Sequence, residues 1–595
     1  MIKNTKDKFK KILLLFNSAF GVYKLSFLTL TVLGFLGGIL EGVGVNALIP
    51  LFSFFTGEGA GDDVVSRAIQ DIFFYFDIEF TVQFLLIFIV TLLVLKAAVL
   101  FVGNYIKIKI VSDYEKDLRA ELFRSVLRAK WPYLLRQKIG YLEKIIMVEA
   151  TKASDVLKMM SGAILLMWGL IVYLVIAVNI SLNITLLTLA FGAVLFFIFK
   201  PIVKKVRMVA QQTAAESKNV AHFVNENMLG AKTIKAMFAV SPIVSRANNY
   251  FETLKKLKIE NFIWQGIPSI APRPVALIFI TILFITLHTK PGFNLASFAA
   301  IIYLIQRIFS DMNTLQSDYF RIHESIPYLE SAMRQKREAI DSQEDIGGRE
   351  QFGFNDTILF ENVSFSYIAH DDVLSGLNFQ IKKGEFVGLI GASGEGKTTI
   401  VDLLLRLFEP TGGKITLDGM HISNIGMEEW RKNIGYVSQD VHLINDTVAN
   451  NIMFYDSLIT EEIIKKAAHM AHIDEVIESL PQGYGTMVGE RGVLLSVGQR
   501  QRIVIARILA RNPQVLILDE ATSALDNESE GEIQKTIENL KGKVTVAIIA
   551  HRLGTVMNCD KLLVLQGGKI VEEGKPRELL RDKESYFFKT YNIRQ

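Results

Sequence analysis

The chain has 595 residues, of which half are hydrophobic, a mean hydropathy of +0.30 and a formal net charge of +4 at pH 7. It is too long for one ordinary domain and too hydrophobic for a typical soluble protein. The small net charge gives no reason to expect a nucleic-acid partner. The single cysteine excludes an intrachain disulfide and a cysteine-based zinc site.

The first part of the chain, residues 1–328, predicts an α-helical membrane domain. A helix of about 20 apolar residues can cross a bilayer, and six apolar segments are long enough to do so. They cover approximately residues 25–55, 82–106, 156–178, 182–203, 263–288 and 294–318. The lysine-rich N-terminus lacks a small-residue cleavage site, so we expect it to be retained.

Charge in the loops predicts the orientation of these segments. Basic residues gather in the long loops after the second and fourth segments, whereas Glu58, Asp62 and Asp63 lie in the first loop. Because cytoplasmic loops carry an excess of Lys and Arg, both termini and both long loops are expected in the cytoplasm. The charged residues 329–354 predict a helical linker.

Residues 355–595 alternate short β-like runs with helical stretches, which indicates an α/β domain. Residues 391–398 read G-A-S-G-E-G-K-T, which matches the phosphate-binding P-loop pattern G-x-x-x-x-G-K-[ST]. An apolar run precedes the loop and a helical stretch follows it. The backbone N–H groups can bind phosphate, Lys397 can reach the β- and γ-phosphates, and Thr398 can bind Mg²⁺. We therefore predict ATP and Mg²⁺ as cofactors, bound through Gly391, Ser393, Gly394, Glu395, Gly396, Lys397, Thr398 and Thr399.

An apolar run at residues 515–518 ends in two carboxylates. At the end of a buried strand, Asp519 can hold Mg²⁺ through water. Glu520 follows it and can act as the general base that activates an attacking water.

Residues 495–502 read L-S-V-G-Q-R-Q-R, about 20 residues before that strand. With the P-loop, this segment resembles the signature of the ATP-binding-cassette (ABC) transporter family. The resemblance implies that Ser496, Gly498 and Gln499 bind the γ-phosphate of ATP held by an opposite cassette. Val497 departs from the family pattern, which leaves its effect on the hydrolysis rate open.

Other segments resemble further elements of the family in the expected order. The resemblance implies that Tyr367 stacks on adenine and that Gln439 senses Mg²⁺ and the attacking water. It also implies that His551 contacts the γ-phosphate and that Asp526 belongs to a loop crossing to the partner cassette. Six spans followed by one α/β P-loop NTPase domain resemble a half-transporter of the type IV ABC exporter fold. A composite site needs two cassettes, so we predict a homodimer, with a heterodimer as the alternative.

Three cations interrupt the apolar segments: Lys96, Arg273 and Arg307. Ionisable residues within spans are costly and usually functional, and cations doubled in a homodimer would suit an anionic headgroup. Residues 268–273 and 303–307 resemble segments of lipid-linked oligosaccharide flippases. The alternative is structural pairing of Arg307 with Asp311, and of Lys96 or Arg273 with Glu41.

Together these features predict an ATPase coupled to transport (a translocase). It would export or flip an amphiphilic, anionic, lipid-linked substrate by alternating access, as a multi-pass protein of the bacterial cytoplasmic (inner) membrane. The alternative within this class is a multidrug or peptide exporter with a hydrophobic cavity. The six spans argue against a soluble cassette ATPase acting on DNA or ribosomes. Glu520 and His551 argue against a channel or receptor that uses ATP only as a ligand.

Overall fold

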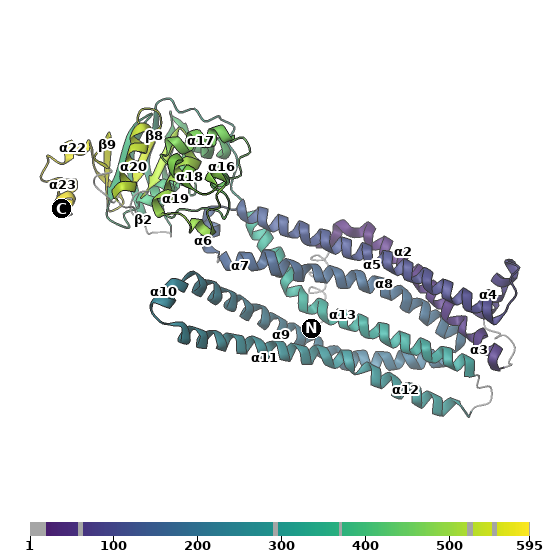
Figure 1. Ribbon diagram of the computed structural model, residues 1–595. Coiled ribbons are helices and arrows are strands. Elements are labelled where there is room, and N and C mark those ends of the chain that lie inside the picture. Colours follow the sequence, from purple (N-terminus) through teal and green to yellow (C-terminus); the bar gives the residue numbers. More distant parts are fainter. Residues whose placement is uncertain are drawn as a thin grey trace. The chain divides into compact units, whose positions relative to one another are not determined.

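The computed structural model describes residues 19–56, 64–137, 139–289, 295–367, 372–520, 527–549 and 556–593 (Figure 1). The chain forms two compact units. The first, called here the membrane unit, comprises Met1–Ala129 and Tyr133–Gln343, and the second, the cassette unit, comprises Lys130–Pro132 and Glu344–Gln595.

Long helices build the membrane unit. They are α2 (Lys24–Asn46), α3 (Leu48–Thr56), α4 (Val64–Tyr75), α5 (Val82–Leu127), α8 (Ala150–Ile180), α9 (Leu182–Leu229), α11 (Val240–Ile270), α12 (Pro272–Leu287) and α13 (Leu295–Asp341). Short helices join them: α6 (Trp131–Arg136), α7 (Ile139–Lys144), a π-helical segment (Ile145–Glu149) and α10 (Ala231–Ala236). Helices α9 and α11 lie side by side with α10 at their turn (Figure 1).

Within the described part of the chain, three helices are long and apolar enough to cross a membrane: Gly21–Leu51, Val82–Leu127 and Tyr141–Ile180. Two shorter apolar helices are Leu182–Val194 and Pro274–Leu287. The fifth predicted segment is divided because Pro272 begins α12, a position where its missing N–H costs no helical hydrogen bond. Helix α13 starts in the sixth segment and continues to Asp341, through the first part of the predicted linker.

A stripe of glycines allows α2 to approach α8 closely. A Cβ on Gly34 would lie 3.1 Å from Leu165 Cα, and one on Gly38 would lie 3.2 Å from Gly169 Cα. At Gly42 a Cβ would lie 2.6 Å from Ile176 Cδ1. Small residues at every fourth position bring helix backbones together, which is the usual basis of tight packing within membranes.

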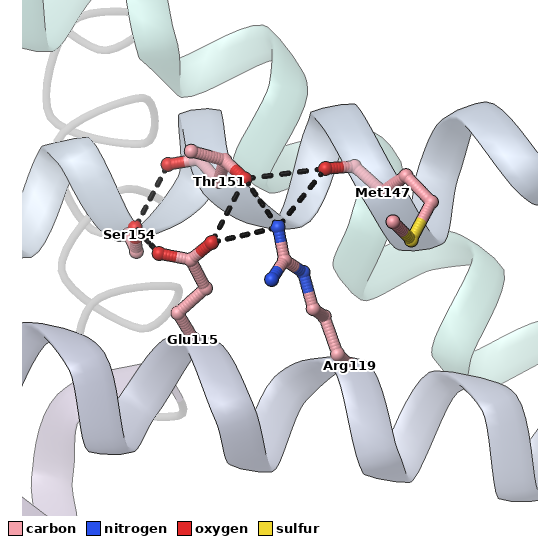
Figure 2. A network of polar contacts seen from close by, with 5 residues as sticks. All are labelled: Glu115, Arg119, Met147, Thr151 and Ser154. Atoms are coloured by element: carbon pink, nitrogen blue, oxygen red, sulfur yellow. Dashed lines mark hydrogen bonds and ion pairs between the residues drawn. The ribbon is translucent and has the colours of Figure 1, made fainter.

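A polar network ties α5 to α8 next to the π-helical segment (Figure 2). Arg119 forms an ion pair with Glu115 at 2.8 Å and donates to Thr151 Oγ1 at 2.8 Å and to the Met147 carbonyl at 3.2 Å. The Thr151 and Ser154 hydroxyls donate to the two Glu115 oxygens at 2.9 and 3.2 Å. The Arg119 side chain thus binds a carbonyl in the irregular turn that precedes α8.

The cassette unit contains two sheets. The first has four strands in the order β2-β1-β4-β5, and the second has six in the order β10-β9-β3-β8-β7-β6. The strands are β1 (Thr357–Ser366), β2 (Asp372–Lys382), β3 (Phe386–Gly391), β4 (Gly412–Leu417), β5 (Met420–His421), β6 (Ile434–Val437), β7 (Val515–Asp519), β8 (Thr545–Ile549), β9 (Lys561–Gln566) and β10 (Lys569–Gly574). All pairings from β9 to β6 are parallel, whereas β10 is antiparallel to β9. Strand β7 is buried throughout, so its sequence reads as a continuous apolar run.

Helices flank these sheets. They are α14 (Lys397–Leu404), α15 (Met427–Asn433), α16 (Val448–Met453), α17 (Glu461–Met470), α18 (Asp474–Ser479), α19 (Val497–Leu509), α20 (Asn527–Asn539), α22 (Pro576–Leu579) and α23 (Tyr586–Ile593). Helix α14 directly follows the loop after β3, and α19 precedes β7. This order places the P-loop and the two carboxylates at the same ends of parallel strands.

The single cysteine gives a test of the cassette packing. Cys559 is 7% exposed, and burial raises the pKa of its thiol to about 12 from an ordinary 9.0. Because only the thiolate reacts, we expect maleimide labelling of the folded protein at pH 8 to be about a thousandfold slower than that of an exposed thiol. Labelling kinetics measured by mass spectrometry would check this, with Ser457→Cys in a Cys559→Ser background as the exposed control. Equal rates at the two positions would contradict the buried environment.

Candidate functional site

The loop between β3 and α14 has a backbone that requires glycine. Gly394 and Gly396 adopt positive φ angles of 88° and 98°. A Cβ on Gly396 would lie 2.6 Å from Leu374 Cδ2, and one on Gly391 would lie 2.5 Å from the Leu565 carbonyl oxygen. The loop leads directly into the N-terminus of α14, whose first N–H groups have no partner within the helix. This arrangement suits a phosphate.

The lysine of the loop lies over its backbone. Lys397 is 6% exposed, and its Nζ donates to the carbonyl oxygens of Gly391 and Ala392 at 2.9 and 2.7 Å. Thr398 is exposed at the first turn of α14, whereas Thr399 is buried. The ammonium therefore lies within the loop, and Thr398 is accessible at the start of α14, as binding of phosphate and Mg²⁺ would require.

An aromatic residue borders the same loop. The Tyr367 hydroxyl is 3.1 Å from Thr399 Oγ1, and the ring is edge-on to Phe365 and Phe408, with centroids 4.9 and 5.3 Å apart. Half of Tyr367 is exposed. The ring is held at the site yet keeps an accessible surface, as stacking on a base requires.

The register of two strands brings Gln439 to Glu520. Strands β6 and β7 pair in parallel, with Val437 opposite Leu518, so the residues that follow both strands meet at one edge. Gln439 Nε2 donates to Glu520 Oε2 at 3.0 Å. Glu520 has a positive φ of 51°, which costs energy for a residue with a Cβ and often marks a functional position. The sequence analysis predicted that both residues belong to the site, but it did not predict the contact between them.

Asp519 lies near a phenol and a second carboxyl group. It is 5% exposed at the end of β7, and the Tyr436 hydroxyl donates to its Oδ2 at 3.4 Å. Burial, reinforced by the Asp519 charge, raises the pKa of the Tyr436 phenol above its ordinary value. Burial and the Asp519 charge also raise the pKa of the Asp402 carboxyl to about 6.

The sequence analysis missed Asp402 and Tyr436. One feature of the sequence could have identified Asp402. It lies one helical turn after Thr398, so both side chains are on one face of α14. No cluster of three or more His, Cys, Asp or Glu suited to a metal occurs among the described residues. Mg²⁺ needs no such cluster, because it commonly binds one or two protein oxygens together with substrate phosphates and water. Thr398, Gln439 and Asp519 therefore fit the predicted metal role.

The signature segment begins a helix with a reciprocal cap. Ser496 is the N-cap of α19: its Oγ accepts from the Gln499 N–H at 3.2 Å, and its own N–H donates to Gln499 Oε1 at 2.9 Å. Val497 is the first helical residue and 40% exposed. The reciprocal cap of Ser496 and Gln499 forms with valine at 497, so valine is compatible with this backbone. His551 and Asp526 lie outside the described residues.

In the membrane unit, two of the predicted cations meet one buried carboxylate. Lys96 Nζ is 2.6 Å from Glu41 Oε2, and Arg307 Nε is 3.3 Å from Glu41 Oε1. Arg307 Nε also lies 3.9 Å from Asp311 Oδ1 and 3.4 Å from the Tyr173 hydroxyl. The ion pairs left open as the structural alternative are thus present for these two residues. The side chain of Arg273 lies outside the described residues.

Comparison with known proteins identifies both units. The family model "ABC transporter transmembrane region" matches residues 27–317, and the model "ABC transporter" matches residues 374–523. An "ATP-dependent lipid A-core flippase" from Legionella pneumophila (strain Paris) is 34% identical over 577 residues, which cover 94% of each chain. A protein of the same name from Albidiferax ferrireducens is 32% identical and covers 84% of this chain and 87% of its own. "Multidrug resistance protein pgp-1" of Caenorhabditis elegans is 44% identical over 42% of this chain and 19% of its own.

A solved structure shares the fold. A bacterial Atm1-family ABC exporter with ATP bound superimposes with a TM-score of 0.79, at 23% identity over 96% of this chain and 99% of that chain. The predicted type IV exporter fold is therefore confirmed. The chain belongs to the ABC transporter family, as a multi-pass membrane exporter whose ATPase is coupled to transport.

Proposed function

We propose that this exporter flips an anionic, lipid-linked amphiphile across the bacterial cytoplasmic membrane, working as a homodimer. The observation that carries the substrate class is the donor geometry of Arg307. Its ion pairs with Glu41 and Asp311 and its hydrogen bond to the Tyr173 hydroxyl use Nε, and the guanidinium carbon lies 5.8 Å from the centroid of the Tyr173 ring. Within the described residues, both terminal nitrogens are left to bind a ligand. A guanidinium edge with two parallel N–H donors fits a phosphate or pyrophosphate.

Exposure and relatives support this assignment. The Arg307 side chain is 35% exposed, whereas the Glu41 side chain that holds it is 5% exposed. The guanidinium is therefore fixed from its buried side and open on the other. Relatives that match most of the chain are named lipid A-core flippases, which adds an independent argument for a lipid substrate.

The nucleotide roles are proposed on the geometry of the cassette unit. Lys397 and the P-loop backbone hold the phosphates, Tyr367 holds adenine, and Thr398 and Asp519 hold Mg²⁺, which supplies charge neutralisation of the phosphates. Glu520, oriented by Gln439, accepts a proton from the attacking water. Ser496, Gly498 and Gln499 present the N-terminus of α19 to a nucleotide bound by a second copy of the chain.

The substrate assignment predicts a specific loss. Arg307→Ala is expected to leave basal ATP hydrolysis unchanged but to lower lipid-stimulated hydrolysis and lipid flipping at least tenfold, because the bidentate phosphate contact is removed. Arg307→Lys is expected to recover only part of this activity, since an ammonium lacks the planar pair of donors. Flipping of a pyrophosphate-linked lipid in proteoliposomes measures the effect.

Variants of the partner carboxylates separate the proposal from purely structural pairing. Glu41→Gln removes the anion that competes for Lys96 and Arg307, so it is expected to lower the lipid concentration needed for half-maximal stimulation several-fold. If pairing with Asp311 were the only role of Arg307, the double variant Arg307→Ala, Asp311→Ala would regain normal flipping. Such recovery would overturn the headgroup assignment.

A hydrophobic substrate is the second candidate. A cavity of about 370 Å³ between α12 and α13 is lined mainly by apolar side chains, including Ala276, Ile280 and Phe309. A neutral drug-sized molecule bound there would stimulate hydrolysis independently of Arg307. Stimulation by a neutral hydrophobic compound that persists in Arg307→Ala, with none by the anionic lipid in the wild type, would favour this function.

A further inference from the structure

Residues 344–350 begin the cassette unit and are called here the docked segment, because they lie against the start of α15. Gly348 adopts a positive φ of 120°, and a Cβ at this position would clash with the Ile425 carbonyl group. The backbone of Glu350 makes two hydrogen bonds, of 3.2 and 3.3 Å, with the residues on either side of Ile425. Helix α15 begins directly after these residues. Backbone contacts therefore hold the docked segment against the N-terminus of α15.

The first side chain of the docked segment binds α15. Glu344 accepts two parallel hydrogen bonds from Arg431, with Nη1 at 2.8 Å from Oε2 and Nη2 at 2.9 Å from Oε1. The two side chains are 21% and 34% exposed, so solvent screens this ion pair only in part. The neighbouring carboxylate is engaged elsewhere, since Asp345 Oδ1 accepts from the Gly347 N–H at 2.9 Å. A bidentate, partly buried contact of this kind is stronger than an ordinary surface ion pair.

Arg431 also binds the C-terminus of α14. Its Nε donates to the Leu405 carbonyl at 3.3 Å, and its Nη2 donates to the Arg406 carbonyl at 3.1 Å. The preceding residue of α15, the fully buried Trp430, donates through Nε1 to the Leu404 carbonyl at 2.7 Å. The last carbonyls of a helix lack partners within the helix, and the helix dipole favours a cation beside them. Helix α15 thus caps three successive carbonyls at the end of α14.

Helix α14 connects this capped end to the phosphate site. It has 8 residues, which corresponds to a length of about 12 Å, and its first residue is Lys397 of the P-loop. A helix this short does not bend easily, so a displacement of its C-terminus also moves the P-loop. On the other side, Glu344 follows the end of α13 after only residues 342 and 343. A continuous path of covalent and hydrogen bonds therefore runs from α13 to the loop that binds phosphate.

We propose that Glu344 and Arg431 are positioning residues of the ATP site, which link the P-loop helix α14 to the end of α13. Bound nucleotide fixes α14 at its N-terminus, and the ion pair passes this constraint to the docked segment. Coupling of this kind is reciprocal: if nucleotide holds the segment more firmly, the held segment favours nucleotide binding by the same factor. The inference goes beyond the proposed function, because it concerns the ATP site and holds for any transported substrate.

Hydrogen–deuterium exchange of the full-length protein measures this coupling. In the wild type, a nonhydrolysable ATP analogue with Mg²⁺ is expected to slow amide exchange in residues 344–350 at least about fivefold. In Glu344→Gln the paired charge-assisted bonds are lost, so exchange is expected to be equally fast with and without the analogue. The affinity of this variant for the analogue is expected to fall by the same factor. The control Glu350→Gln makes the same change at an exposed side chain of the segment and is expected to behave like the wild type.

A second variant and the ratio of exchange rates separate coupling from a purely structural role. Arg431→Lys keeps the charge but lacks the planar set of donors that binds a carboxylate and two carbonyls together, so it is expected to lose most of the nucleotide effect. A purely structural ion pair would make exchange faster by the same factor in both nucleotide states, and the ratio between the states would stay at its wild-type value. Such an unchanged ratio in Glu344→Gln would overturn the proposal, as would the absence of any nucleotide effect in the wild type.

Discussion

Glu520→Gln is expected to lower ATP hydrolysis at least about a hundredfold while ATP binding persists. The amide has nearly the shape of the carboxylate but cannot accept a proton from water. Gln439 already donates to Glu520 Oε2 at 3.0 Å, and this contact survives if the amide presents its oxygen to Gln439. The geometry of the site is therefore kept while its basicity is removed. Phosphate release and nucleotide-trapping assays measure the two effects separately.

A matched control is Glu475→Gln, which makes the same chemical change at an exposed position of α18. It is expected to hydrolyse ATP at the wild-type rate. Near-normal phosphate release by Glu520→Gln would show that another group removes the proton. A loss of ATP binding in this variant would instead indicate a structural role for the carboxylate.

Mixed dimers are expected to show that each ATP site is shared between two chains. Lys397→Ala removes the P-loop ammonium, and Ser496→Arg fills the N-terminus of α19 that Ser496 caps. As a homodimer, each variant is expected to hydrolyse ATP at least about a hundredfold more slowly than the wild type. In a mixed dimer, one composite site carries both defects and the other carries neither. The mixed dimer is therefore expected to recover at most half of the wild-type activity.

Co-expression with two different affinity tags isolates the mixed dimer for this measurement. If the P-loop and the signature of one chain served the same nucleotide, every site in the mixed dimer would be defective, and no activity would return. Activity equal to that of the wild type would also contradict shared sites, because one of the two is disabled by design.

The sequence predicted features whose parts are contiguous. The P-loop, its strand and its helix lie within a few residues of one another. The structure has β3 before the loop and α14 after it, as the sequence predicted. The pair of Gln439 and Glu520 depends on the parallel register of β6 and β7, which spacing along the chain does not reveal. The position of Asp402 one helical turn after Thr398 was visible in the sequence, but the effect of the Asp519 charge on its pKa depends on the fold.

The charged residues of the membrane unit show the same limit. Their occurrence within apolar segments predicted a role, and Asp311 one turn from Arg307 was a visible partner, but Glu41, which contacts both Lys96 and Arg307, lies on another helix. Arg307 sits beside Glu41, which is 266 residues earlier and buried by helix packing. The approach of α2 to α8, set by Gly34, Gly38 and Gly42, fixes where that carboxylate lies. No local pattern in the sequence defines such a position.

This glycine stripe also has a mechanical consequence. Helices whose backbones touch cannot slide past each other without clashes, so α2 and α8 are expected to behave as a single stiff lever during the transport cycle. Glu41 belongs to α2 and Tyr173 to α8, whereas Arg307 belongs to α13. A movement of α13 relative to α2 that separates the two side chains would break the 3.3 Å contact between Arg307 and Glu41. The ion pair would then hold α13 against α2. A phosphate that binds the Arg307 guanidinium in place of Glu41 would release the two helices.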